Sequence, residues 1–493
     1  MRLTPALLLI AALPAAAALP ANLDRLQPDL SRLATTPRFE LPVADVVNAR
    51  RLADTKPGIA QRFAVGLPTA LQLSDGSWET TDSETAIWRL RLHSNGARSL
   101  NLELARVRLP AGAQLWLYDS AGKVTQGPYT AAHVNRDGRL WTAAVAAEDA
   151  VLELRVPPSQ RDAAHMQIVQ VNHGYRDILK AGGESKSGSC NIDTVCAQAN
   201  AWRDDLRSVA RITIGGTYLC TGQLINNVRQ DLTPFFITAD HCLIGESDTP
   251  AESVVFYWNY ATSSCGGAPD GSLEQNQSGS TFVADNTASD FTLVRLAQTP
   301  PAEFNIYYAG FDISGVPPQS GAGIHHPQGD EKRISLYDTP ATQAQANIEG
   351  RTVDAWRVNW SQGTTEQGSS GSGLWNQDHR LIGVLSGGEA SCDNRGGNDF
   401  YGRLDVAWTA EPQAAGQLKA HLDPDDSGVT SVPGRDPTRA ADPVTTPAPA
   451  PTPPPPTVAP APTKGGSSPF AGSLDLVLLA LFGFARFRRV RRV

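Results

Sequence analysis

The sequence predicts an all-β protein with two folded units and a tail that belongs to neither. Three observations lead to this fold class and to this division of the chain. Apolar and polar residues alternate in several short runs, all six cysteines fall between Cys190 and Cys392, and residues 442–463 consist mainly of Pro, Ala and Thr. Period-2 alternation is typical of strands, whereas a Pro-rich segment stays extended and cannot form a core. The chain has 493 residues, which is long enough for two or three domains, and it is 41% apolar, which is enough to bury their cores.

Residues 1–18 have the layout of a cleavable signal peptide. Arg2 precedes an apolar run at 7–13, which is followed by the alanines at 16–18. The apolar run is too short to span a bilayer. The sequence therefore predicts cleavage near Ala18 and an exported, secreted protein.

Residues 19–186 predict a β-rich propeptide with the form of a small sandwich. Residues 88–92 and 100–104 alternate, and the segments 94–96 and 110–112 carry turn residues. This pattern predicts strands of a half-exposed sheet.

Residues 187–435 predict a second β-rich unit, a pair of barrels. Short strands are expected at 254–258 and 381–385, and leucines spaced by four predict a short helix at 417–422, before Asp423 and Pro424. Six cysteines in an exported chain indicate three disulfides, whose pairing the spacing leaves open. The chain has no C-x-x-C pair for zinc.

Residues 436–464 predict a linker, and residues 465–493 a membrane-directed end. This end combines Gly465-Gly466, an apolar stretch at 474–485 with Asp475 at its start, and a run of arginines. It resembles the GlyGly-type C-terminal sorting signals of Gram-negative exported proteins. The resemblance implies transient membrane contact and retention at the cell surface; a simple tail anchor is the alternative.

The net charge of -8 gives no electrostatic reason to expect nucleic-acid binding. We expect protein and peptide partners, a monomer, and no cofactor.

Two separated motifs predict acyl-transfer chemistry. His241 lies beside Cys242, and a bridge from Cys242 to Cys220 would hold the imidazole in place. Ser370 lies between Gly368 and Gly371, which let the backbone fold so that the amides of Gly368 and Ser370 converge as an oxyanion hole. Ser370 is the predicted nucleophile and His241 its base.

Such a base needs a carboxylate on its other ring nitrogen. Asp290 stands just ahead of an apolar strand and is the predicted acid, whereas the side chain of the adjacent Asp240 would point away. The predicted triad is His241, Asp290 and Ser370.

The order of these residues resembles the chymotrypsin-like clan, and the surrounding blocks resemble the bacterial lysyl endopeptidase family. The blocks that carry this resemblance are residues 187–193, 238–242, 257–260, 277–280, 289–292, 324–327 and 331–335. The resemblance covers nearly all of residues 187–428. It implies a chymotrypsin-like double β-barrel with a short C-terminal helix, preceded by a prodomain.

The resemblance also implies roles for individual residues. It pairs Cys190 with Cys392, Cys196 with Cys265 and Cys220 with Cys242, and it makes Asp399 the pocket acid for a substrate lysine. Ser386 and Gly387 would lie on the substrate-binding strand, although the family has a histidine at Ser386 and a tryptophan stacked on it without a convincing counterpart here. Because Asp399 is present, the resemblance implies a preference for lysine. A different pocket preference, or a surface-displayed binding protein on a protease scaffold, are the alternatives.

Other polar residues have structural interpretations. His325 and His326 are neighbours on a strand and point to opposite faces, which argues against a metal site. Glu366 is expected to be an exposed loop residue. Ser369 stands where trypsin-like zymogens carry the aspartate that binds the new N-terminus, so activation by that route lacks its carboxylate. Cleavage after Lys186 would leave Ser187 first.

Overall fold

The computed structural model describes residues 28–55, 60–80, 85–179, 187–348, 350–409 and 413–444. Described residues up to Val444 form one compact unit. In this part of the chain, no helix has the length and apolar character needed to cross a bilayer.

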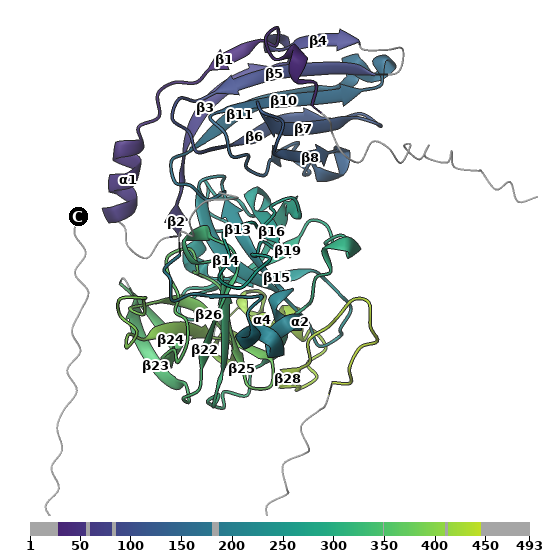
Figure 1. Ribbon diagram of the computed structural model, residues 1–493. Coiled ribbons are helices and arrows are strands. Elements are labelled where there is room, and N and C mark those ends of the chain that lie inside the picture. The colour runs from purple at the N-terminus through teal and green to yellow at the C-terminus, as the bar shows by residue number, and fades with distance from the viewer. Residues whose placement is uncertain are drawn as a thin grey trace, which may run out of the picture. The chain divides into compact units, whose positions relative to one another are not determined.

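The N-terminal residues form a β-sandwich, as predicted. One sheet has the order β1-β5-β10-β7-β8, with β4 paired to β5, and the other has the order β3-β11-β6-β9 (Figure 1). The strands are β1 (Arg38–Glu40), β3 (Ala64–Gln72), β4 (Ser77–Thr80), β5 (Ala86–His93), β6 (Ser99–Arg108), β7 (Gln114–Asp119), β8 (Thr125–Tyr129), β9 (Leu140–Trp141), β10 (Asp149–Val156) and β11 (His165–Gly174).

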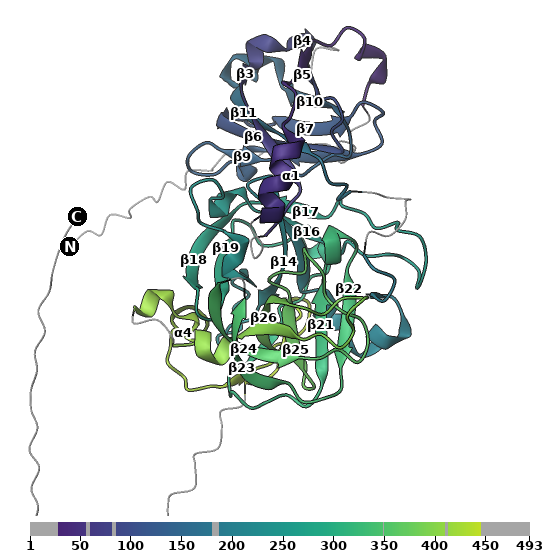
Figure 2. The same ribbon diagram turned by 90° about the vertical axis from the view of Figure 1, so that its left-hand side faces the viewer.

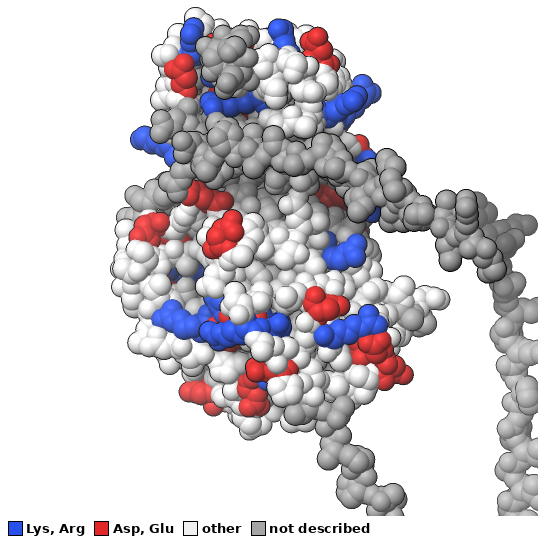
Figure 3. Space-filling model, turned by 90° about the vertical axis from the view of Figure 1, so that its right-hand side faces the viewer, with Lys and Arg blue, Asp and Glu red and all other residues white. Residues whose placement is uncertain are grey.

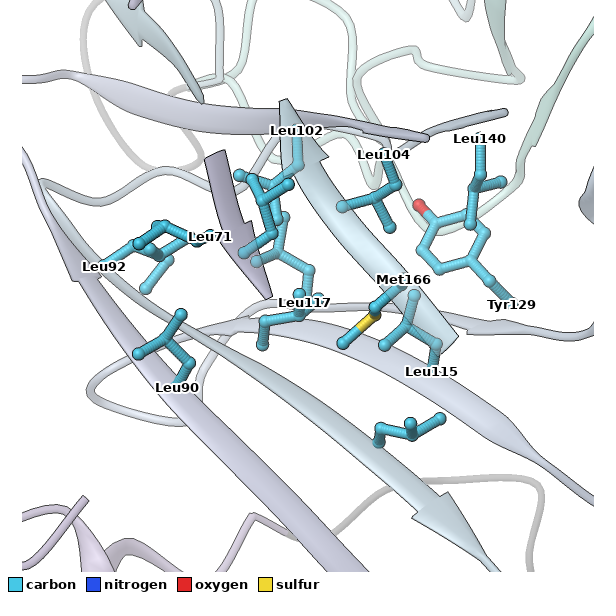
Figure 4. Close-up of a cluster of buried hydrophobic side chains, with 14 of the residues drawn as sticks. Leu71, Leu90, Leu92, Leu102, Leu104, Leu115, Leu117, Tyr129, Leu140 and Met166 are labelled. Atoms are coloured by element: carbon cyan, nitrogen blue, oxygen red, sulfur yellow. The ribbon is translucent and has the colours of Figure 1, made fainter. Parts of the chain in front are cut away.

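Leucines from both sheets form the core of this sandwich. Leu90 and Leu117 come from one sheet and Leu102 and Leu104 from the other, and all four are at most 1% exposed (Figure 4). Burying one leucine side chain contributes about 1.5–3 kcal/mol. The alternation at 88–92 and 100–104 thus places its leucines as predicted.

The prediction of a half-exposed sheet was wrong for several polar positions. Arg89 is buried because its guanidinium pairs with the buried Glu153, at 2.7 Å. Asn101 is buried because its side-chain amide donates to the carbonyl of Gly216, which belongs to the following domain, at 3.1 Å. Both polar groups are satisfied by partners that lie far away in the sequence.

The domain that follows contains two sheets, seen in Figure 2. Sheet one has the order β17-β16-β13-β14-β15-β19-β18, and sheet two has the order β12-β22-β21-β25-β26-β27-β24-β23, with β20 joined to β26 and β28. The strands of sheet one are β13 (Val209–Ile214), β14 (Tyr218–Ile225), β15 (Phe235–Thr238), β16 (Val255–Trp258), β17 (Asn276–Ser278), β18 (Ser280–Asn286) and β19 (Phe291–Leu296). Those of sheet two are β12 (Ile192–Asp193), β20 (Gly310–Asp312), β21 (Gly321–His325), β22 (Arg333–Tyr337), β23 (Thr342–Ile348), β24 (Arg351–Val358), β25 (Gly373–Asn376), β26 (Arg380–Gly388), β27 (Asp399–Arg403) and β28 (Ser431–Val432). This arrangement is the predicted all-β, chymotrypsin-like fold.

The short strand β2 (Gln61–Arg62) comes from the N-terminal part but joins sheet one. It pairs antiparallel with β14, with Arg62 opposite Tyr218 and Gln61 opposite Leu219.

Helices are short. The predicted terminal helix is α4 (Leu418–Leu422), which ends before Asp423 and buries both leucines in the core between the two sheets. The chain also has α1 (Val46–Thr55), α2 (Arg203–Leu206) and α3 (Leu404–Ala407), which were not predicted. Single 3-10 segments occur at η1 (Leu30–Arg32), η2 (Leu73–Asp75), η3 (Ala131–His133), η4 (Pro158–Ala163), η5 (Ala197–Trp202), η6 (Asp240–Cys242), η7 (Ala251–Ser253), η8 (Ala302–Phe304), η9 (Pro327–Gly329) and η10 (Ala414–Gly416).

Charged residues of both signs are interspersed on the described part of the face drawn in Figure 3. Most of that face is uncharged.

Candidate active site

His241 is held at the end of β15 by the 3-10 turn η6 and by a disulfide. Its neighbour Cys242 is bonded to Cys220 on β14. Both cysteines are fully buried, and the imidazole is nearly so. All three pairings implied by the family resemblance are present: Cys190–Cys392, Cys196–Cys265 and Cys220–Cys242.

Asp290 lies directly before β19 and faces the imidazole of His241. Its carboxylate accepts the ring Nδ1 of His241 at 2.9 Å through Oδ2, and the backbone amide of His241 at 3.0 Å through Oδ1. The residue has a φ of 50°, a left-handed conformation that non-glycine residues seldom adopt and that is often found at functional sites. Asp240 turns elsewhere, and its carboxyl bonds the side chain of Thr287.

The carboxylate of Asp290 is completely buried, yet it stays ionised. Burial by itself raises the pKa of this carboxyl, but His241, the Arg351 guanidinium and the Ser386 hydroxyl together bring it below the usual range. A charged acceptor therefore faces Nδ1 and leaves Nε2 free to accept a proton.

Ser370 lies on a loop that two strands hold in place. The amide of Thr221 on β14 donates to the carbonyl of Ser370 at 2.8 Å, and the amide of Gly371 donates to Leu385 on β26 at 2.9 Å. Gly371 has a φ of 80°, and a Cβ there would lie 2.1 Å from the Oγ1 of Thr238. The loop therefore needs glycine at this position.

His241 and Ser370 line the same cleft, which has a volume of about 720 Å³. Ser386 and Gly387 on β26 line it too. The structure thus brings four of the predicted site residues to one concave surface, with Asp290 behind His241.

Asp399 is buried behind the wall of this cleft. Its Oδ2 accepts the indole Nε1 of Trp360 at 2.6 Å and the hydroxyl of Thr365 at 2.7 Å. Oδ1 is buried and makes no hydrogen bond of normal geometry with the described residues, although the backbone amide of Ala390 acts on the carboxyl. Thr365 lines the cleft, as do Gly388 and Phe400, which lie beside Asp399. Burial raises the pKa of the Asp399 carboxyl to about 6, although its hydrogen bonds oppose this.

His325, the last residue of β21, and the next residue, His326, bond different protein groups. The ring of His325 contacts the hydroxyls of Ser369 at 2.8 Å and Ser335 at 3.1 Å, while the ring of His326 bonds the carbonyl of Asp330. Burial lowers the pKa of His325 to about 3, so the ring is neutral. A neutral contact between Ser369 and His325 therefore lies beside Ser370, at the position where the sequence predicts that a carboxylate is missing.

A metal-like grouping elsewhere has another explanation. Asp193, Cys196 and Cys265 bring potential ligand atoms within 4.8 Å of one another. Both sulfurs are joined in a disulfide, so they are not thiolate ligands.

The prediction that Glu366 is an exposed loop residue was wrong. Its Oε1 accepts the backbone amide of Gly188 at 2.7 Å and the side-chain amide of Asn191 at 2.6 Å. These partners lie 178 and 175 positions away, so no local sequence signal could reveal them. Glu366 ties the start of this domain to the loop that carries Gly368 and Ser370.

Replacing Glu366 by alanine is expected to lower kcat roughly 10- to 100-fold with a smaller change in KM, because the serine loop loses its anchor and a small misplacement slows the reaction. Steady-state kinetics on a peptide substrate measure this split. The control, Glu366→Gln, retains an acceptor oxygen and should lose much less. An unchanged kcat in Glu366→Ala would show that the loop keeps its position without this contact.

Two predicted processing residues, Ala18 and Lys186, lie outside the described residues. Ser187, which follows Lys186, donates its backbone amide and its hydroxyl to Oδ2 of Asp330, at 3.1 and 3.0 Å. The sequence interpretation also missed Arg351, whose guanidinium contacts Asp290 from 61 residues away.

Comparisons with known proteins show the family of this chain. The C-terminal domain of the lysyl endopeptidase family matches residues 184–402, and its N-terminal domain matches residues 40–175. A lysyl endopeptidase of Pseudomonas aeruginosa is 30% identical over 385 residues, which cover 71% of this chain and 80% of that protein.

Similar solved structures are also proteases, at low similarity. The active form of the Rv3671c protease from M. tuberculosis is 18% identical, covering 46% of this chain and 89% of its own, with a TM-score of 0.30. A serine endoprotease from Yersinia pestis is 13% identical, covering 43% of this chain and 64% of its own, with a TM-score of 0.30. The sequence relationship is the decisive one: the chain belongs to the lysyl endopeptidase family and is a serine endopeptidase.

Proposed function

We propose that this protein is an exported endopeptidase that cleaves peptide bonds preferentially after lysine, through a triad of His241, Asp290 and Ser370. The observation that carries the lysine preference is the carboxyl group of Asp399. It is buried behind the cleft, and its Oδ1 makes no hydrogen bond of normal geometry with the described residues, although the backbone amide of Ala390 acts on the carboxyl. A buried carboxyl oxygen of this kind favours a cationic partner.

In the proposed acylation step, the Oγ of Ser370 attacks the substrate carbonyl while Nε2 of His241 takes its proton. Asp290, bonded to Nδ1, orients the ring and stabilises the imidazolium. The amides of Gly368 and Ser370 donate to the carbonyl oxygen as it gains negative charge. The C–N bond then breaks, the imidazolium protonates the leaving amine, and an ester to Ser370 remains.

Water completes the proposed cycle. Its proton passes to His241 as its oxygen attacks the ester, and the bond to Ser370 breaks with return of the proton to Oγ. The lysine side chain reaches past Thr365 and pairs its ammonium with Asp399.

The test is to map every bond that the matured enzyme cuts in a denatured protein mixture, by mass spectrometry, with Ser370→Ala as the control. Cuts almost wholly after lysine support the proposal. Cuts that include arginine or small residues would retain the triad and discard Asp399 as the selecting group. Cuts that persist in Ser370→Ala would discard the triad.

The preference for lysine is expected to weaken as the pH falls through about 6, because the pKa of Asp399 is raised to about 6 and its neutral form no longer attracts an ammonium. The measurement is the ratio of kcat/KM for matched substrates with lysine and with uncharged norleucine at the cleaved position. Taking the ratio cancels the protonation of the shared triad. A ratio that stays constant between pH 5 and 8 would contradict the assignment.

Maturation is part of the proposal. Residues 1–18 direct export, and cleavage after Lys186 turns the Ser187 amide into an ammonium that already faces Asp330. Before cleavage, the amide of Ala60 donates to the carbonyl of His241 at 3.3 Å, and β2 runs along β14. In this proposal, residues 60–62 belong to the propeptide, and their contacts support a prodomain that lies beside His241 until it is released.

A further inference from the structure

Arg351 reaches the predicted triad from the opposite sheet. Its Nη1 donates to Oδ1 of Asp290 at 2.8 Å, and its side chain is 19% exposed while the carboxylate is fully buried. Oδ1 also accepts the backbone amide of His241, and Oδ2 accepts the ring Nδ1. Donors thus act on both oxygens, so the carboxylate cannot rotate without losing one of them.

The strand that carries Arg351 is fixed close to Asp290. Arg351 is the first residue of β24 and pairs with Ile348 on β23. The amide of Asp354 on the same strand donates to the carbonyl of Ala288 at 2.9 Å, two residues before Asp290. This main-chain bond sets the distance between β24 of sheet two and the Asp290 loop of sheet one.

The charge of Arg351 meets a specific electrostatic need. A buried carboxylate is unfavourable without a cationic partner, and the guanidinium of Arg351 supplies a charge that does not depend on the protonation of His241. Four groups face or neighbour the carboxylate: His241 and Asp240 from η6, Arg351 from β24, and the Ser386 hydroxyl from β26. Among these described groups, Arg351 is the permanent cation.

We propose that Arg351 is a positioning residue that fixes the carboxylate of Asp290 against His241 and holds the pair ready for catalysis at acidic pH. The inference rests on the proposed triad. A cation beside the pair disfavours uptake of a proton by the pair as a whole, so it moves the acidic limb of the activity profile to lower pH.

The test compares Arg351→Ala and Arg351→Lys in enzyme matured from the full-length chain. Arg357→Ala is the matched control, since Arg357 is an exposed arginine on the same strand. Active-site titration with a fluorophosphonate gives the fraction of competent enzyme in each preparation. Then kcat and KM are measured from pH 5 to 9 on a lysyl peptide substrate.

In Arg351→Ala, the acidic limb of the kcat/KM profile is expected to move to higher pH by about one unit. At acidic pH this shift lowers kcat/KM about tenfold, mainly through a lower kcat. Arg351→Lys keeps the charge, so its acidic limb should lie close to that of the wild type. Arg357→Ala should have the same pH profile as the wild type. Asp240→Asn, measured in parallel, separates the titration of that neighbouring carboxyl, whose pKa burial raises to about 6.

Each other outcome overturns the inference. If Arg351 is only structural, Arg351→Ala lowers the titrated fraction but leaves the pH profile of competent enzyme unchanged. A lysine variant no better than alanine would exclude the role of charge. If the wild type shows no Ser370-dependent turnover, the proposed triad fails together with this inference, whereas an unshifted Arg351→Ala profile in an active enzyme overturns this inference alone.

Discussion

Replacing Ser370 by alanine is expected to lower kcat on a lysyl peptide by a factor on the order of 10⁶, because no other group can form the acyl-enzyme. The fold should survive, since the loop is held by backbone bonds from Thr221 and Gly371 that do not involve the hydroxyl. Turnover measured over hours, with the unfolding temperature recorded in parallel, checks both statements.

The matched control is Ser391→Ala, which removes a second hydroxyl from the same cleft. It should retain wild-type activity within about threefold, as expected for a contact that is not part of the reacting unit. If cleavage after Lys186 is carried out by the enzyme itself, Ser370→Ala alone accumulates with its propeptide attached. More than a trace of activity in Ser370→Ala, once contamination is excluded by titration, would remove this serine from the mechanism.

Replacing Asp399 by asparagine is expected to lower kcat/KM for lysine substrates roughly 10²- to 10³-fold, the usual effect of deleting one partner of a buried charge pair. Activity on a norleucine substrate should change little, because that side chain has no charge to pair. The result is a change of selectivity with an intact triad. It is measured as the ratio of kcat/KM for the two substrates.

Asp393→Asn is the control for this experiment. Asp393 also lines the cleft, but it is exposed, so solvent screens the attraction between its carboxylate and a substrate ammonium. Its variant should keep the wild-type ratio within about threefold. An equal loss in both variants would indicate a diffuse acidic field, and no loss in Asp399→Asn would place the lysine-binding carboxylate elsewhere.

Local patterns in the sequence predicted much of the architecture. The leucines of β5 and β6 alternate and meet in one core, and the two leucines of α4 repeat at four residues and point inward. These predictions succeeded because periodicity is a property of neighbouring residues. The same reasoning predicted that Arg89 and Asn101 are exposed. Both are buried, because their partners lie far away in the sequence.

The site follows the same division. The sequence by itself determined which residues are candidates, and it predicted catalytic roles for Ser370, His241 and Asp290, since glycines, a neighbouring cysteine and an apolar strand leave local signatures. The family resemblance supplied the disulfide pairing and Asp399. Only the tertiary structure decided that Glu366 anchors the serine loop and that Arg351 touches Asp290. Those contacts join sheets and segments separated by 61 to 178 residues, and a side chain's partner across such a distance is set by packing, which no local pattern records.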